Sequence, residues 1–254
     1  MTMQHLLYCI FVHEKNSPTV RIAGVDGQPI GIVSHNGLSA SVSPCIEANL
    51  TPDIARIQAY QKVIERFNHR RTIIPMRYGC LFPNKESIAR HLGQRGRYYL
   101  SLLSELNGSV EMGIRVMMSA RIGSDVSDVS DRSEQEAAPT SNTQFPPSGK
   151  EYLTARKAHY CREDHNLEET EQLIAQLPAA FSGLFLRFKS ELAPTRQTGR
   201  TVSASDNPLL SLYFLVRRNS VESFREAFRR VASRGPHKLL LSGPWPPYNF
   251  VTLD

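Results

Sequence analysis

The sequence predicts an α+β protein whose two units are joined by an acidic segment. Apolar or alternating runs typical of strands occur in both halves, and apolar stripes with helical spacing lie between them. Residues 124–149 carry five acidic residues and one arginine among many Ser and Pro residues, a composition typical of a linker. The predicted division is therefore a unit at 1–123, a linker at 124–149 and a second unit at 150–254.

The first unit is expected to begin with three strands. Residues 6–12 form an apolar run, which is typical of a strand buried on both faces. The runs 30–33 and 38–42 flank Asn36-Gly37, a pair that favours the positive φ angles of a tight hairpin turn. These features predict a central strand and a hairpin.

Two helical regions and two strands follow. Thr51, Pro52 and Asp53 predict a helix start, with a hydroxyl cap, a proline at the first position and an acid in the first turn. The buried stripe of that helix would comprise Ile54, Ile57, Tyr60, Ile64 and Phe67.

Residues 72–78 predict a strand that Pro75 confines to an edge or a bulge, and residues 84–106 predict helix broken near Gly93 and Gly96. Residues 110–118 alternate like a half-buried strand. The order of elements suggests a modified ferredoxin-like domain with an early hairpin.

The second unit is expected to hold helices and a strand-helix-strand unit. Residues 150–192 predict helix, with a capping pair at Asn166 and Glu169 and a kink at Pro178. Its stripe would comprise Ile174, Leu177, Phe181, Leu184, Phe185, Phe188 and Leu192. Residues 209–216 and 238–242 predict strands on either side of a helix that starts after Ser220.

Composition points to the reducing interior of a cell. Cys9, Cys45, Cys80 and Cys161 are scattered and form no Cys-x-x-Cys pair, so a disulfide framework is not expected. No apolar stretch reaches the roughly 20 residues that span a bilayer, and the apolar run 6–12 has no Lys or Arg before it as a signal peptide would. A cytoplasmic protein is the prediction.

Catalytic motifs are not found. The sequence has no phosphate-binding glycine loop, no Gly-x-Ser-x-Gly and no His-Glu-x-x-His. His159, Cys161 and His165 resemble metal ligands, but on one helix they would not share a face. No metal or cofactor is predicted; an enzyme with a polar pocket around these three residues stays an alternative.

Nucleic-acid binding is a weaker alternative. Lys and Arg exceed Asp and Glu by seven in residues 51–100 and by five in residues 217–238. However, Arg225, Arg229 and Arg230 share their predicted helix with Glu222 and Glu226 at ion-pairing spacing. No nucleic-acid-binding signature accompanies them, so a solvated, ion-paired face is the favoured interpretation.

The C-terminal residues 242–251 hold three of the sixteen prolines and the only tryptophan. Such a segment is extended and stiff. It docks either on its own domain or on a partner, and the intramolecular alternative is favoured because an exposed Trp-Tyr-Phe patch is unfavourable in water.

This tail, Gly-Pro-Trp-Pro-Pro-Tyr-Asn-Phe-Val, resembles the C-terminal signature of the GvpL/GvpF family of gas vesicle proteins. Further segments resemble the family in the same order along the chain: Leu7–Ile10, Ile74–Phe82, Leu106–Glu111 and Gly149–Arg156. The departures are Tyr78 for Phe, Cys80 for Thr and Asn249 for Ser. The acidic linker matches nothing specific.

The resemblance implies a non-enzymatic, cytoplasmic accessory protein needed to build gas vesicles, with the two-unit α+β fold described above. It also implies binding to the major shell protein and to other accessory proteins, and it brings no catalytic residues. Neither nucleic acid nor a membrane is an expected partner. The candidate contact residues are Arg225, Arg229, Arg230, Trp245, Pro246, Pro247, Tyr248 and Phe250.

Overall fold

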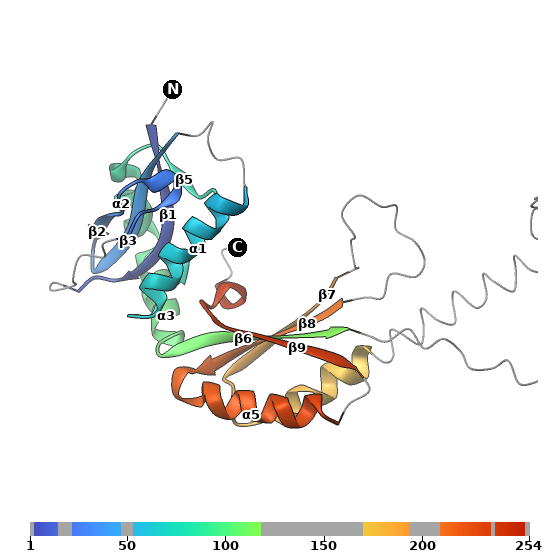
Figure 1. The fold of residues 1–254 in the computed structure, drawn as a ribbon. Helices are drawn as coiled ribbons and strands as arrows, with labels where there is room; N and C mark the ends of the chain where they lie inside the picture. The colour runs from blue at the N-terminus through green and yellow to red at the C-terminus, as the bar shows by residue number, and fades with distance from the viewer. Residues whose placement is uncertain are drawn as a thin grey trace, which may run out of the picture.

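The computed structural model describes residues 3–14, 22–46, 53–117, 170–193, 209–234 and 237–251. They form two antiparallel sheets with helices packed on them (Figure 1), which confirms the predicted α+β class. The predicted linker 124–149 lies outside the described residues, so its role as a linker stays a prediction.

The first sheet has the strand order β2-β3-β1-β4, and β5 also pairs with β1. Its strands are β1 (Met3–Val12), β2 (Gly31–His35), β3 (Leu38–Ile46), β4 (Ile74–Pro75) and β5 (Leu81–Phe82). The predicted hairpin is confirmed, because Asn36 (φ 46°) and Gly37 (φ 79°) turn the chain between β2 and β3. A short 3-10 turn, η1 (Val25–Gly27), precedes the hairpin.

Helices cover both faces of the first sheet. One face packs on α1 (Ile54–Asn68), and the other packs on α2 (Lys85–Gln94) and α3 (Gly96–Glu105). The predicted break falls at Arg95 between α2 and α3. The cap of α1 is Asp53 rather than Thr51, since its side chain accepts a hydrogen bond from the Arg56 amide at 2.8 Å.

The stripe predicted for α1 holds in its C-terminal part, where Tyr60, Ile64 and Phe67 are buried. Ile54 and Ile57 were expected to be buried too, but they are 77% and 44% exposed. Helical periodicity identifies which side of a helix faces the core, but not how far along the helix the facing surface extends.

The second sheet has the strand order β7-β8-β6-β9. Its strands are β6 (Ser109–Met117), β7 (Arg187–Ala193), β8 (Leu209–Arg217) and β9 (Lys238–Trp245). One face packs on α5 (Val221–Ala232), η3 (Pro178–Phe181) and the helical residues 170–176. The short turns η4 (Arg218–Ser220) and η5 (Tyr248–Phe250) follow β8 and β9.

Strand β6 belongs to this second sheet, whereas the sequence analysis placed it in the unit 1–123. It pairs with β8 along its whole length and with β9. The β-α-β-β-α-β order of a ferredoxin-like fold therefore runs through β6, the helix at 170–176, β7, β8, α5 and β9. Alternation alone cannot reveal which strands will be the neighbours of β6.

The predicted helix over 150–192 is wrong after residue 177. The helix at 170–176 is followed by η3, which begins at Pro178, and Phe188 and Leu192 lie in β7. Residues four apart share a face of a strand as well as of a helix, so their spacing fits both structures. Pro178 ends the helix because a proline lacks the amide that continues it. Asn166 and Glu169 lie outside the described residues.

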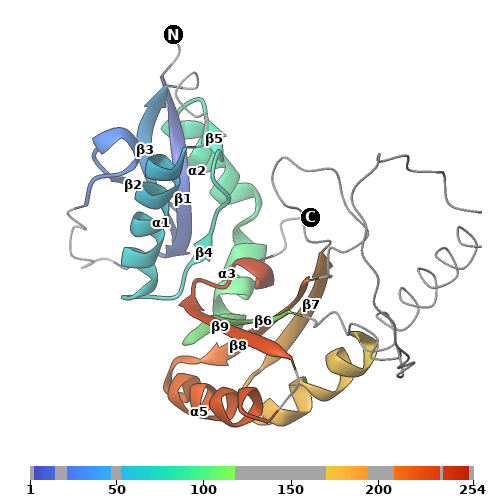
Figure 2. The ribbon, with the colours of Figure 1, turned by 45° about the vertical axis from the view of Figure 1, so that its right-hand side comes forward.

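The two sheets share part of one hydrophobic core. Leu215 of β8 and Phe250 of η5 are buried among residues of the first unit, including Leu7, Tyr99 and Leu106. Figure 2 shows η5 between the second sheet and the elements of the first unit. The C-terminal segment therefore lies at the junction of the two units.

Candidate partner-binding site

The aromatic tail docks on its own chain. Pro244 and Trp245 close the edge strand β9, whose register against β6 is interrupted between Ser242 and Trp245. Proline is tolerated at such an edge or bulge. Pro246 and Pro247 are buried, and Phe250 is 1% exposed. Of the predicted contact residues in the tail, Tyr248 is the most open at 36% exposed, while Trp245 is half-buried.

A buried carboxylate fixes the tail in place. The backbone amide of Asn249 and its side-chain Nδ2 donate to the two oxygens of Glu111, at 2.8 and 2.7 Å. Glu111 lies on β6 and is 4% exposed. Burial raises the pKa of Glu111 above its ordinary value, and the hydrogen bonds from Asn249 oppose that rise.

Arg187 of β7 holds the tail from a second side. Its guanidinium lies over the Phe250 ring, 5.4 Å from the centroid, and donates to the Phe250 carbonyl at 3.4 Å. The same side chain pairs with Glu105 of α3 at 3.1 Å. Arg187 thus contacts the first unit and the tail together.

Sequence reasoning missed Glu111, Asn249 and Arg187 as a group. The alternation of residues 110–118 predicts a half-buried strand and gives Glu111 no role, although Glu111 lies in a segment that carries the family resemblance. Asn249 was noted only as a departure from the family pattern. Glu111 and Asn249 are 138 positions apart in the sequence, and spacing along the chain gives no signal for such a contact.

Helix α5, which carries the predicted arginines, lies on the opposite side of the second sheet from η5 (Figure 1). Arg225 pairs with Glu222 at 3.3 Å, and Arg229 pairs with the same carboxylate at 3.4 Å. Arg229 and Arg230 are exposed, and Arg225 is half-buried. The Arg225 guanidinium also donates a hydrogen bond to the Gly243 carbonyl, near the end of β9, at 3.5 Å.

The eight predicted contact residues therefore do not form one surface. Phe250, Pro246 and Pro247 are buried at the junction, and Arg229 and Arg230 project from α5. The favoured intramolecular interpretation of the tail agrees with this arrangement. Partner contact through these residues stays a prediction, and only the exposed ones can make it without rearrangement.

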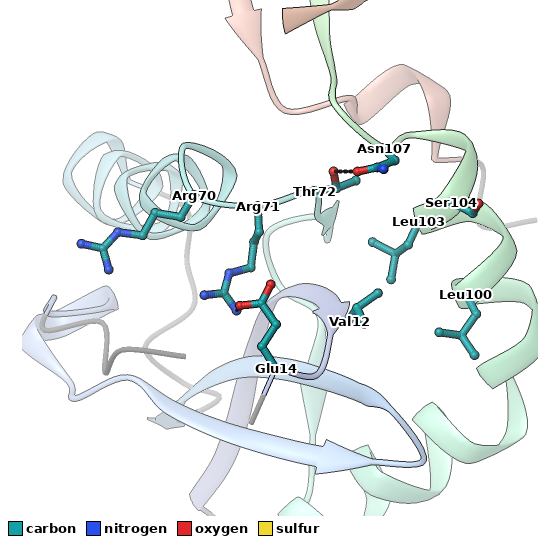
Figure 3. A pocket seen from close by; sticks show the side chains of 9 residues that line it. All are labelled: Val12, Glu14, Arg70, Arg71, Thr72, Leu100, Leu103, Ser104 and Asn107. Atoms are coloured by element: carbon teal, nitrogen blue, oxygen red, sulfur yellow. Dashed lines mark hydrogen bonds and ion pairs between the residues drawn. The ribbon is translucent and has the colours of Figure 1, made fainter. Parts of the chain in front are cut away.

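A separate pocket of about 350 Å³ lies in the first unit, close to the junction (Figure 3). Val12, Leu100 and Leu103 supply apolar walls, and Arg70 and Arg71 supply cations. Arg71 is largely buried, lies 4.8 Å from the Phe11 ring centroid and pairs with Glu14 at 3.6 Å. The buried cation of this pocket, Arg71, is thus paired with a carboxylate of the chain.

The far wall of this pocket is continuous with the turn into β6. Thr72 Oγ1 donates to Asn107 Oδ1 at 3.2 Å, and the Gly108 amide donates to Thr72 Oγ1 at 3.2 Å. Beside it, Arg218 donates to the carbonyl and the side-chain oxygen of Asn68, at 2.6 and 3.0 Å. These bonds connect the end of α1 to the second sheet.

Within the described ranges, no group of three or more His, Cys, Asp or Glu side chains is placed to hold a metal ion. His159, Cys161 and His165 lie outside those ranges. None of the helices in the described part of the chain is long and apolar enough to cross a membrane.

Comparison with known proteins gives a consistent result over nearly the whole chain. The family described as gas vesicle synthesis protein GvpL/GvpF matches residues 4–252. Gas vesicle protein F of Streptomyces sp. (strain CB03234) is 24% identical, with 88% of each chain covered. Gas vesicle protein L1 of Halobacterium salinarum is 20% identical, covering 96% of this chain and 89% of the relative.

Solved structures agree in fold. The crystal structure of gas vesicle protein GvpF from Anabaena sp. PCC7120 superposes with a TM-score of 0.73 at 16% identity, covering 99% of this chain and 97% of that one. GvpF from Microcystis aeruginosa gives a TM-score of 0.69 at 14% identity, covering 98% and 99%. The match takes in both sheets and the tail that joins them, and the chain belongs to the GvpL/GvpF family of gas vesicle synthesis proteins.

Proposed function

We propose that this chain is a non-enzymatic accessory protein that binds the major shell protein and other accessory proteins while a gas vesicle nucleates or grows. The observation that supports this most directly is the family match over residues 4–252. The descriptions of the family and of these relatives name gas vesicle proteins and mention no reaction. The proposal places the protein in the cytoplasm, in association with gas vesicles.

The proposed role meets a physical need of the shell subunit. A very hydrophobic subunit that polymerises needs a partner that shields it before assembly. Such contacts combine an apolar centre with a polar rim. In the predicted contact set, Tyr248 and the half-buried Trp245 would supply apolar area, and Arg225, Arg229 and Arg230 would supply charge.

The test is a binding titration of the purified chain against freshly solubilised major shell protein. Saturable binding is expected, and its absence would contradict direct contact with the shell protein. A tail truncation at Ser242 is a poor variant, because it removes Trp245 from β9 and Phe250 from the core.

Point variants test the predicted contact residues instead. Tyr248→Ala and Arg229→Glu are measured separately, because the tail and α5 lie on different sides of the second sheet; each removes an exposed group and leaves Phe250 in place. The variant that removes a contact should lower the affinity at least tenfold in a folded protein. An unchanged affinity in both variants would exclude these two residues as contacts and leave the assembly role itself standing.

A further inference from the structure

The second sheet has a face that no described helix covers over most of its area. Side chains of Val110, Met112 and Ile114 point toward α5, so their neighbours in β6 point to the other side. Register places Glu191, Ser211, Arg115 and Leu240 directly opposite one another across all four strands. The term open face is used here for this side of the sheet, represented by Arg115, Met117, Lys189, Tyr213, Lys238 and Leu240.

The described residues cover only one end of this side. Glu111, Leu215 and Arg187 lie there beneath the tail and the first unit. Farther along the same strands, Met117 is 44% exposed and Leu240 is 46% exposed. Arg115, Lys189 and Lys238 are exposed as well. Figures 1 and 2 show η5 over one end of the sheet, with no helix or strand of the described chain over the other.

The charges of the open face are unbalanced. Among the described residues, three cations, Arg115, Lys189 and Lys238, stand beside one exposed carboxylate, Glu191. This carboxylate accepts a hydrogen bond from Tyr213 Oη at 3.4 Å. Within the described residues, neither Arg115 nor Lys238 makes an ion pair, and Lys189 interacts at a distance with Glu111. On α5, by contrast, Arg225 and Arg229 both pair with Glu222.

A sheet face exposed only to solvent carries mainly polar side chains, which alternate along each strand with apolar side chains that face the core. Here Met117 and Leu240 lie among three cations, and Glu191 is the one exposed carboxylate that the described residues set against them. Four strands spaced about 4.8 Å apart give a platform about 14 Å wide, which accommodates one helix about 10–12 Å in diameter. The opposite face already carries a helix, α5, in this way.

We propose that the open face docks an amphipathic helix of another gas vesicle protein, one that presents Asp or Glu side chains beside apolar ones. The acidic side chains would pair with Arg115, Lys189 and Lys238, and the apolar ones would cover Met117 and Leu240. This inference rests on the proposed function for the origin of the partner, and it assigns the contact to a different surface from α5.

The test uses the full chain and two probes. One probe is an 18-residue amphipathic helical peptide of Leu and Glu, with a Leu and Lys peptide as its control. The other probe is the solubilised major shell protein. Arg115→Glu with Lys189→Glu is compared with Lys62→Glu with Arg66→Glu, which makes the same change of charge at exposed positions of α1 in the first unit. Thermal midpoints confirm that each variant is folded.

The open-face pair is expected to weaken binding of the Glu peptide at least tenfold, whereas the α1 pair should change it less than twofold. Leu240→Asn should weaken it several-fold without a change in charge. Equal losses for both charge-reversed pairs, no loss for the open-face pair, or equal binding of the Lys peptide would each overturn the inference.

The two probes separate this inference from the proposed function. In one outcome, the open-face pair loses peptide binding and the wild-type chain does not bind the shell protein. That outcome supports the docking surface and contradicts direct contact with the shell protein. In the other outcome, the wild-type chain binds the shell protein but not the Glu peptide, and the open-face pair leaves the affinity for the shell protein unchanged. That outcome supports the proposed function and overturns the docking surface.

Discussion

At the scale of single residues, Glu111 shows how surroundings change the behaviour of a side chain. It is a carboxylate on a strand, yet it is 4% exposed and accepts two hydrogen bonds from Asn249. Because burial raises its pKa, the folded protein holds its proton more tightly than the unfolded chain does. Glu111 therefore links the docking of the tail to pH.

We expect wild-type stability to fall relative to Glu111→Gln as pH rises. The unfolded pKa of a glutamate is about 4.3, so the loss begins near that pH and ends once the pH exceeds the raised folded pKa. Thermal midpoints measured from pH 4 to 8 at constant ionic strength give the difference. Glu226→Gln, on the exposed side of α5, controls for the loss of one negative charge. If the difference in thermal midpoint between the wild-type protein and Glu111→Gln is constant across this range, the link between Glu111 and pH is refuted.

Phe250 and Tyr248 provide a matched pair of tail residues. Phe250 is 1% exposed and lies in the core shared by the two units, while Tyr248 is 36% exposed. Phe250→Ala should lower the free energy of unfolding by about 3–5 kcal/mol, the usual cost of removing a buried phenyl ring. Tyr248→Ala should cost much less. Urea unfolding measures both, and similar losses would show that the tail is not held by Phe250.

At the scale of elements, the turn that leads into β6 depends on Gly108. Its φ angle is +68°, a region that residues with a side chain occupy only with strain. Spacing along the chain does not mark this turn as the crossing from one sheet to the other. Its importance follows from the pairing of β6 with β8 and β9.

Gly108→Ala should lower the free energy of unfolding by about 1–2 kcal/mol. Gly96→Ala is the control, since Gly96 begins α3 and a Cβ there would meet nothing within 4 Å. The control should be neutral or slightly stabilising, because alanine favours helix more than glycine does. Chemical denaturation of both variants distinguishes them, and equal effects would show that the positive φ is unimportant.

At the scale of the whole molecule, the two units are joined by polar and apolar contacts. Arg218, just after β8, donates to both oxygens of Asn68 at the end of α1, and Asn68 is 5% exposed. Phe250 and Leu215 complete the apolar part of the junction. We therefore expect the described parts of the two units to unfold as one cooperative body.

Arg218→Ala should lower the free energy of unfolding by about 1–2 kcal/mol, since it leaves buried acceptors of Asn68 without this donor. Arg217→Ala, at the adjacent exposed position, should change it by less than about 0.5 kcal/mol. Calorimetry gives the cost and also the number of transitions. Two well-separated transitions in the wild-type chain would contradict a shared core.

The sequence by itself determined the α+β class, the hairpin at Asn36-Gly37 and the break between α2 and α3, because local propensity and periodicity control such features. It also carried the family resemblance in the tail. Tertiary structure decided that β6 joins the second sheet, that Phe188 lies in a strand and that the tail binds Glu111 and Arg187. These outcomes depend on contacts between residues far apart in the chain, and the free energy of such contacts is not encoded in the spacing of neighbouring residues.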